Sequence, residues 1–298
     1  MKLPQFKHSQ LVQELEAAGI TQLKLVAPLG MGTSNQNFLA NSHGESWVLR
    51  VNNPLTNKLC PRDNEVACWR IAEAAGLAPE LKFVSQDFRY YLSRYIDTEK
   101  TWQQQHQCHP RAAQLLGQLL GKLSKLALPK HRVTPRSQWC FYQKEIVNRS
   151  AKLRPLLQTV AKEILALDSR VEAIINRLEQ TQSLRFCHRD LNPHNLLLEK
   201  NRLLCIDFEY ACSSDPRLEL AAMLAHHKLG DSQQDWLIQD QLKGVEQERH
   251  QTLQDANFLY WLFTACWALI MCDDGKGAQS WYENAMIKIR RHEALITR

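Results

Sequence analysis

Apolar residues in the first part of the chain follow two patterns: helical spacing, and short continuous runs bounded by turn residues. Within residues 6–18 they recur at helical spacing, and this segment ends at Gly19, which predicts an amphipathic helix. A second helix is predicted from Pro61 to Gly76. Short apolar runs bounded by turn residues predict strands at 23–29, 38–40, 47–51, 81–84 and 90–95.

Helical periods dominate the rest of the chain. Leucines line one side of residues 110–128, and further helices are predicted at 140–158 and 161–178. Asp215 is expected to cap another helix, and we interpret Gly230 to Asp240 as a mobile loop.

Between these helices lies a polar loop flanked by apolar runs. The runs at 184–187, 196–198 and 203–206 predict a short strand and then a hairpin. His188, Arg189 and Asp190 open the loop, and Asn195 stands five residues after Asp190. The second hairpin strand ends at Asp207. A carboxylate that accepts a hydroxyl proton, an amide oxygen and a second carboxylate are the groups that phosphoryl transfer from Mg-ATP requires.

These motifs resemble those of a known superfamily. The sequence His188-Arg189-Asp190-Leu191 with Asn195 is similar to the catalytic loop of protein-kinase-like enzymes. Ile206-Asp207-Phe208-Glu209-Tyr210 resembles the branch that contains choline and ethanolamine kinases, thiamine kinase and aminoglycoside phosphotransferases. The resemblance implies that Asp190 is the catalytic base and that Asn195, Asp207 and Glu209 bind Mg²⁺. It implies that His188 supports the loop.

The same resemblance implies an ATP site in the N-terminal part. Glycines at 30 and 32 and the polar residues Thr33, Ser34 and Asn35 form a loop between two predicted strands, suited to covering phosphates. Arg50 lies within a predicted strand, where a buried cation needs a partner. By position Glu65 is that partner. The connector after Tyr95 and Ile96 would meet the adenine, although the glycine that family members often carry there is absent.

The implied fold is α+β and protein-kinase-like, with two lobes. Residues 1–96 would form a small nucleotide-binding lobe with an antiparallel sheet. Residues 97–298 would form a mainly helical lobe with the catalytic loop and the substrate site.

An aromatic segment at 258–271 bears on the substrate. Tyr260, Thr264 and Trp267 recur at helical spacing and form one stripe. Such a stripe is ordinarily core, but it could also enclose a cationic nitrogen, with Glu219 as an acidic partner. Glu219 could instead orient the catalytic loop, the interpretation that we favour. Late aromatic residues of this kind are similar to those of choline and thiamine kinases.

Composition adds constraints on the cell compartment and the partners. The net charge is +6, and basic residues interleaved with aromatics are not found, so a nucleic-acid partner is not expected. The nine cysteines include no Cys-x-x-Cys pair, which argues against zinc and favours buried free thiols. No secretory signal opens the sequence and no apolar run is long enough to span a bilayer, so we expect a cytoplasmic protein without a membrane partner.

The sequence therefore predicts an ATP- and Mg²⁺-dependent kinase for the hydroxyl of a small cationic alcohol of the choline, ethanolamine or thiamine type. An aminoglycoside phosphotransferase and an inactive kinase-like binding module are the alternatives. A protein kinase is disfavoured, because no Ala-Pro-Glu follows Asp207. The sequence leaves the oligomeric state and the identity of the alcohol open.

Overall fold

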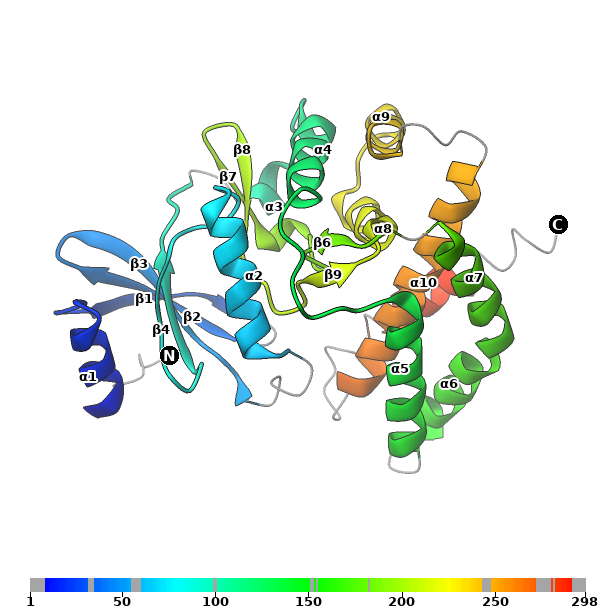
Figure 1. Ribbon diagram of the computed structural model, residues 1–298, viewed down its shortest axis with the longest axis horizontal. Helices are drawn as coiled ribbons and strands as arrows, with labels where there is room; N and C mark the ends of the chain where they lie inside the picture. Colours follow the sequence, from blue (N-terminus) through cyan, green and yellow to red (C-terminus); the bar gives the residue numbers. More distant parts are fainter. Residues whose placement is uncertain are drawn as a thin grey trace. The chain divides into compact units, whose positions relative to one another are not determined.

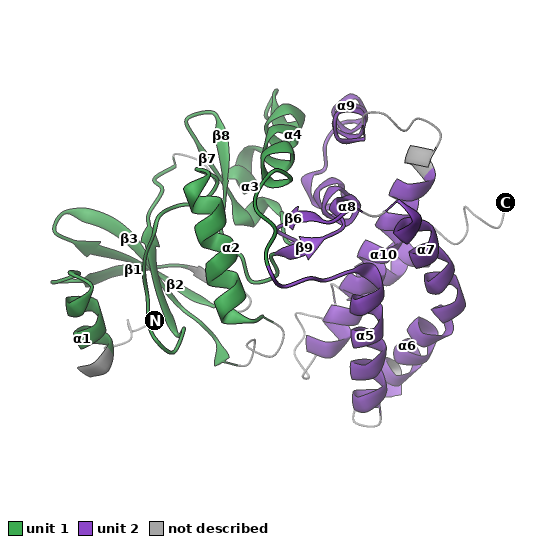
Figure 2. Ribbon diagram, in the orientation of Figure 1, with its two compact units in different colours: residues 1–129, 190–211 green, residues 130–189, 212–298 purple. Residues whose placement is uncertain are grey.

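The computed structural model describes most of the chain. The described residues are 9–31, 35–54, 60–98, 101–150, 153, 155–181, 183–242, 248–271, 280 and 282–290. They form two compact units that do not follow chain order (Figure 2): one contains residues 1–129 and 190–211, the other residues 130–189 and 212–298. The predicted lobe boundary after residue 96 is a different division of the chain and stays a prediction.

The first unit is built on a five-stranded antiparallel sheet, as predicted (Figure 1). The strand order is β1-β2-β3-β5-β4, with bounds Lys24–Met31, Gln36–Ser42, Glu45–Val51, Tyr90–Arg94 and Leu81–Val84. Helix α1 (Ser9–Ala17) contributes Leu11 and Leu15 to a core that includes Trp47 and Leu92 of the sheet. Alternating side chains of the strands thus bury one sheet face beneath α1.

Helix α2 (Arg62–Ala74) lies between β3 and β4 in the sequence. Its N-cap position is Pro61, as the sequence predicted, and Gly76 takes a φ of +68° just after its end. Glycine adopts this left-handed conformation without the steric cost that a side chain brings. The chain can therefore turn sharply from α2 into β4.

The hairpin that carries the second motif also belongs to the first unit. Strands β7 (Leu196–Glu199) and β8 (Arg202–Cys205) pair in antiparallel register. Lys200 and Asn201 both have positive φ, 46° and 63°. A two-residue hairpin turn needs these values for its twist to match that of the flanking strands. Helix α3 (Trp102–Gln105) packs against β7 and helix α4 (Ala112–Leu123) against β8. These two helices thus hold the hairpin that connects Asn195 with Asp207 in place.

The second unit is mainly helical. Helix α10 (Glu248–Met271) packs against the four helices α5 (Pro135–Ser150), α6 (Pro155–Ala166), α7 (Asp168–Gln180) and α8 (Pro216–His227). Residues 282–290 are also helical and contribute to the same core. Strand β6 (Arg185–Cys187) pairs with β9 (Cys212–Ser214). None of the helices described is both long and apolar enough to cross a membrane.

Two expectations about this unit were wrong. Three helices, α5 to α7, replace the two predicted at 140–158 and 161–178, because Pro135 and Pro155 each open a helix in the first position that proline favours. Helix α9 (Asp231–Gln241) replaces the expected mobile loop. Gly230 takes the N-cap position of α9, and the buried Leu237 holds the helix to the rest of the unit.

Glu219 of α8 anchors the chain that leads into the loop with Asp190. Its Oε1 accepts a hydrogen bond from the backbone nitrogen of His188 at 2.7 Å, and its Oε2 accepts one from Arg189 at 2.7 Å. The Arg189 side chain donates to Ser214 Oγ at 2.7 Å and to Gln138 Oε1 at 2.8 Å. Arg189 has a φ of +68°, a costly conformation that these contacts hold in place.

We predict that Glu219→Ala destabilises the fold by about 3 kcal/mol, because two buried backbone N–H groups lose their acceptor. Glu219→Gln should cost less, since the amide oxygen still accepts one of the two hydrogen bonds. The midpoint of urea unfolding measures both effects. Glu163→Ala is the matched control, because it removes an exposed carboxylate paired with Arg290 and should cost under about 1 kcal/mol. Equal stability of the Glu219 and Glu163 variants would contradict the anchoring role.

Candidate active site

Asp190 is held in a single orientation by two amide side chains. Its Oδ1 accepts a hydrogen bond from Asn192 Nδ2 at 2.8 Å, and its Oδ2 accepts one from Asn195 Nδ2 at 2.7 Å. Asn192 also caps the 3₁₀ turn Pro193–Asn195 by accepting from the His194 backbone nitrogen. Burial raises the pKa of Asp190 to about 6 against the opposing effect of the two amides. The loop therefore presents a fixed carboxylate suited to accepting a proton.

Asp207 lies beside this loop at the end of β8. The backbone nitrogen of Ile206 donates to the carbonyl oxygen of Asn195 at 3.0 Å, which joins the two motifs directly. Asp207 has a φ of +67°, a rare conformation for a residue with a side chain. Its carboxylate is 36% exposed and bonds to Arg50, with Oδ1 3.0 Å from Nη1. Desolvation and neighbouring carboxylates raise the pKa of Asp207 against the pull of Arg50.

Arg50 is the centre of a buried ionic cluster. It lies on β3, only 6% exposed, as the sequence predicted for a cation within a strand. Its Nη2 is 2.9 Å from Glu65 Oε1 and 2.7 Å from Glu209 Oε1, and its Nε donates to Asn52 Oδ1 at 2.7 Å. Burial alone lowers the pKa of Arg50, but the surrounding carboxylates outweigh it and keep the pKa above the ordinary value. The expected pair of Arg50 and Glu65 is present.

Glu209 joins three segments through one oxygen atom. Its Oε1 accepts from Asn35 Nδ2 at 2.6 Å, from Arg50 Nη2 at 2.7 Å and from Arg62 Nη1 at 2.8 Å. These donors come from the segment before β2, from β3 and from α2. Burial opposes ionisation, but the two cations and Asn35 hold the pKa of Glu209 below its ordinary value. Glu209 is thus an ionised connection between the segment before β2, the sheet and α2.

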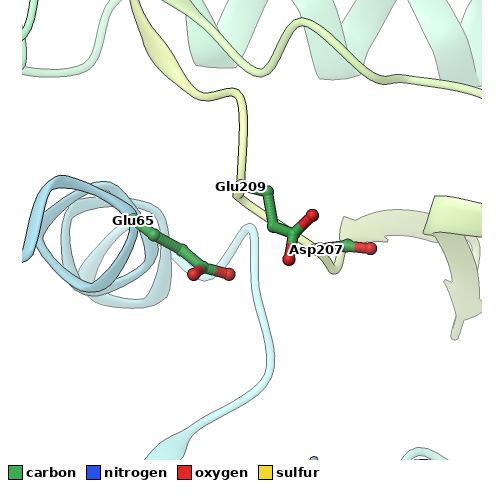
Figure 3. A group of neighbouring side chains, drawn as sticks. All are labelled: Glu65, Asp207 and Glu209. Carbon is green, nitrogen blue, oxygen red and sulfur yellow. The ribbon is translucent and has the colours of Figure 1, made fainter. Parts of the chain in front are cut away.

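Three carboxylates gather closely enough to bind a cation. Glu65, Asp207 and Glu209 each offer an oxygen atom, and these atoms lie within 4.8 Å of one another (Figure 3). Glu65 comes from α2, whereas Asp207 and Glu209 follow β8 (Figure 3). Hard carboxylate oxygens of this kind fit Mg²⁺. Asn195 uses its amide nitrogen on Asp190, which leaves its oxygen as the atom that could bind a metal.

The remaining nucleotide-site predictions are only partly covered by the structure. Thr33 and Ser34 lie outside the described residues. Asn35 is buried, and its Oδ1 accepts from the backbone nitrogen of Asn53 at 3.1 Å. At the expected connector, the Tyr95 nitrogen donates to Ser46 O at 3.1 Å and Ile96 is buried. Contact of this connector with adenine stays a prediction.

The predicted substrate residues Glu219, Tyr260 and Trp267 lie in the second unit. Glu219 is engaged by two backbone N–H groups, which favours its role in orienting the loop. Tyr260, Thr264 and Trp267 are partly exposed, whereas most of the residues between them on α10 are buried. The stripe therefore packs against the core without being enclosed by it.

Two residues near the predicted site were missed by the sequence analysis. Arg62 is buried between Glu65 and Glu209, with its Nη1 2.7 Å from Glu65 Oε2. The signal for it was a cation three residues before Glu65 at a helix start, where a basic residue is unfavourable. His226 of α8 hydrogen-bonds the Tyr260 hydroxyl. No pattern in the sequence linked His226 with Tyr260, because α8 and α10 meet only in the folded unit.

Comparison with known proteins identifies the fold. Solved structures similar to this chain include choline/ethanolamine kinases and aminoglycoside phosphotransferases. A choline kinase LicA from Streptococcus pneumoniae aligns over 94% of this chain and 98% of its own, with a TM-score of 0.71 and 16% identity. A ternary complex of streptomycin, ATP and APH(2")-IIa aligns over 95% and 97%, with a TM-score of 0.67 and 14% identity. These likenesses show that the fold is the protein-kinase-like one that the sequence predicted.

Sequence comparison identifies the family. Protein LicA of Haemophilus influenzae is 28% identical over 215 residues, which cover 70% of this chain and 60% of LicA. The chain thus matches somewhat less than two thirds of the length of that relative. The sequence profile of the phosphotransferase enzyme family (APH) matches residues 26–253. The chain belongs to this phosphotransferase enzyme family.

Proposed function

We propose that this protein transfers the γ-phosphoryl group of Mg-ATP to the hydroxyl of a small cationic alcohol, of which choline is the leading candidate. The observation that carries the proposal is the fixed carboxylate of Asp190, joined through Asn195 to the segment that bears Asp207. A base next to a metal-binding carboxylate and a buried cation is the arrangement that phosphoryl transfer needs.

Each group of the cluster has a defined part in this reaction. Asp190 would orient the alcohol hydroxyl and accept its proton as the oxygen bonds to phosphorus. Arg50 would bind the phosphates, with Glu65 positioning its guanidinium. Bound Mg-ATP supplies the phosphoryl group and the charge neutralisation, and ADP leaves with the bridging oxygen. Asn195 and Asp207, with help from Glu209, would hold the metal. Most of the rate enhancement would come from positioning and electrostatic stabilisation.

Two independent observations support a cationic alcohol as the acceptor. A structure with the same fold is a choline kinase, and a LicA protein of Haemophilus influenzae is similar in sequence. Within the second unit, Tyr260 and Trp267 present partly exposed aromatic faces along α10. An ammonium group gains about 2 kcal/mol or more on such a face once it is desolvated. Ethanolamine and thiamine share the hydroxyl and the cationic nitrogen, so they are part of the same proposal.

An aminoglycoside is the second candidate acceptor. It is supported by the likeness to the streptomycin complex of an aminoglycoside phosphotransferase. Aminoglycosides carry several ammonium groups and would favour an acidic surface over an aromatic one, which places them second. An inactive binding module is the third possibility, and the presence of Arg50, Glu65, Asp190, Asn195 and Asp207 argues against it.

Substrate testing decides among these candidates. We expect ADP release from ATP with choline, ethanolamine or thiamine, abolished by EDTA and restored by Mg²⁺. Release with kanamycin alone would keep the phosphotransferase chemistry and refute the cationic alcohol. Silence with every acceptor, although ATP still binds, would support the inactive module.

We predict that Asp190→Asn lowers kcat about 10³-fold, because the amide cannot accept the hydroxyl proton. ATP affinity, measured by calorimetry, should change less than about threefold, since Asp190 would contact the alcohol. Asp231→Asn is the matched control, as Asp231 is an exposed acid at the start of α9 and should leave kcat unchanged. Full turnover by Asp190→Asn would remove this residue from the base role.

We predict that Trp267→Ala raises the KM for the alcohol about 10- to 30-fold, because a cation–π contact of about 2 kcal/mol is lost. The KM for ATP should stay the same. Trp236→Ala, which removes a tryptophan that is 38% exposed on α9, is the control and should alter neither KM. A loss of thermal stability with an unchanged alcohol KM would assign Trp267 to the core.

A further inference from the structure

Arg62 occupies a position that local rules disfavour. It is the first residue of α2, where the positive end of the helix dipole repels a cation. It is also only 6% exposed, so its charge is removed from water. Because Arg62 is unfavourable both at the helix start and in its buried position, its charge must be compensated by its neighbours.

Arg62 and Arg50 share the same two carboxylates. Arg62 Nη1 is 2.7 Å from Glu65 Oε2 and 2.8 Å from Glu209 Oε1. Arg50 Nη2 is 2.9 Å from Glu65 Oε1 and 2.7 Å from Glu209 Oε1. Glu65 thus bonds to one cation through each oxygen, and Glu209 bonds to both cations through one oxygen.

Arg50 carries a further bond that nucleotide binding would disturb. Its Nη1 lies 3.0 Å from Oδ1 of Asp207, the carboxylate proposed to hold the metal. For Asp207 to bind a metal and for Arg50 to bind phosphate, the guanidinium has to exchange partners. The side chains of Glu65 and Glu209 are 0% and 3% exposed, and a buried carboxylate that loses its counter-ion is strongly destabilised. Something must keep these two acids compensated during the exchange.

We propose that Arg62 is a positioning residue that keeps Glu65 and Glu209 in place and charge-compensated while Arg50 exchanges Asp207 for the phosphates of the nucleotide. This inference rests on the proposed function, because it concerns the same nucleotide site. Arg62 acts through Glu65 and Glu209, so its removal should leave Arg50 as the one cation that the described residues bring to both acids. Arg50 would then be held more tightly by the acids and would be less available to phosphate.

The test compares Arg62→Met and Arg62→Lys with Arg70→Met. Arg70 is a matched control, because it lies on the same helix and pairs with Glu73 three residues on, but it is exposed. Calorimetry with ADP, with and without Mg²⁺, gives the nucleotide affinity, and thermal unfolding without ligand gives the stability. We expect Arg62→Met to weaken Mg-ADP binding about tenfold, Arg62→Lys to weaken it less, and Arg70→Met to leave it unchanged.

Repeating the Arg62→Met substitution in the Glu209→Gln variant separates charge compensation from a merely structural role. Glu209→Gln removes one of the two charges that need compensation, so adding Arg62→Met there should cost less than about threefold in Mg-ADP affinity. This double variant also remains testable if Arg62→Met alone fails to fold. A tenfold loss in both backgrounds would overturn the inference, as would wild-type affinity in Arg62→Met. Absence of Mg-ADP binding by the unmodified chain would overturn the proposed nucleotide chemistry, and with it this inference.

Discussion

The buried charge of Arg50 is the constraint on which the rest of the site depends. A guanidinium in the middle of a sheet must be surrounded by acceptors, and here they come from α2 and from the segment after β8. The ion pairs therefore join elements far apart in the sequence around one point. The cluster holds Glu65, Asp207 and Glu209 in place relative to one another.

The loop that carries Asp190 depends on a different kind of anchoring. Glu219 binds the backbone just before Asp190, whereas Asn192 and Asn195 bind the carboxylate itself. The two amide donors hold the Asp190 carboxylate in one orientation. Asp190 is thus held by fixed hydrogen bonds, whereas Arg50 shares its carboxylate partner Glu65 with Arg62.

Much of this could be predicted from the sequence because the signals are local. Short apolar runs bounded by turn residues predicted the five strands, and the spacing of Asp190, Asn195 and Asp207 around a hairpin predicted that these residues lie close together. The fold followed from the same motifs. Helix boundaries were less accurate in the second unit, where prolines mark the starts of α5 and α6 and a further helix, α7, begins at Asp168. The expected loop at 230–240 formed a helix, because burial of Leu237 outweighed its polar composition.

The sequence by itself determined the sheet, the hairpin and the identities of the groups suited to phosphoryl transfer. The two structural features depend on short-range sequence patterns, and the groups depend on residue type. Tertiary structure decided which groups are shared. Glu209 Oε1 accepts three hydrogen bonds, Arg62 lies between two acids, and Glu219 accepts from backbone N–H groups. Each of these arrangements joins residues that are distant along the chain. Partners of this kind are selected by burial, since a charge removed from water must find its complement wherever the fold brings one.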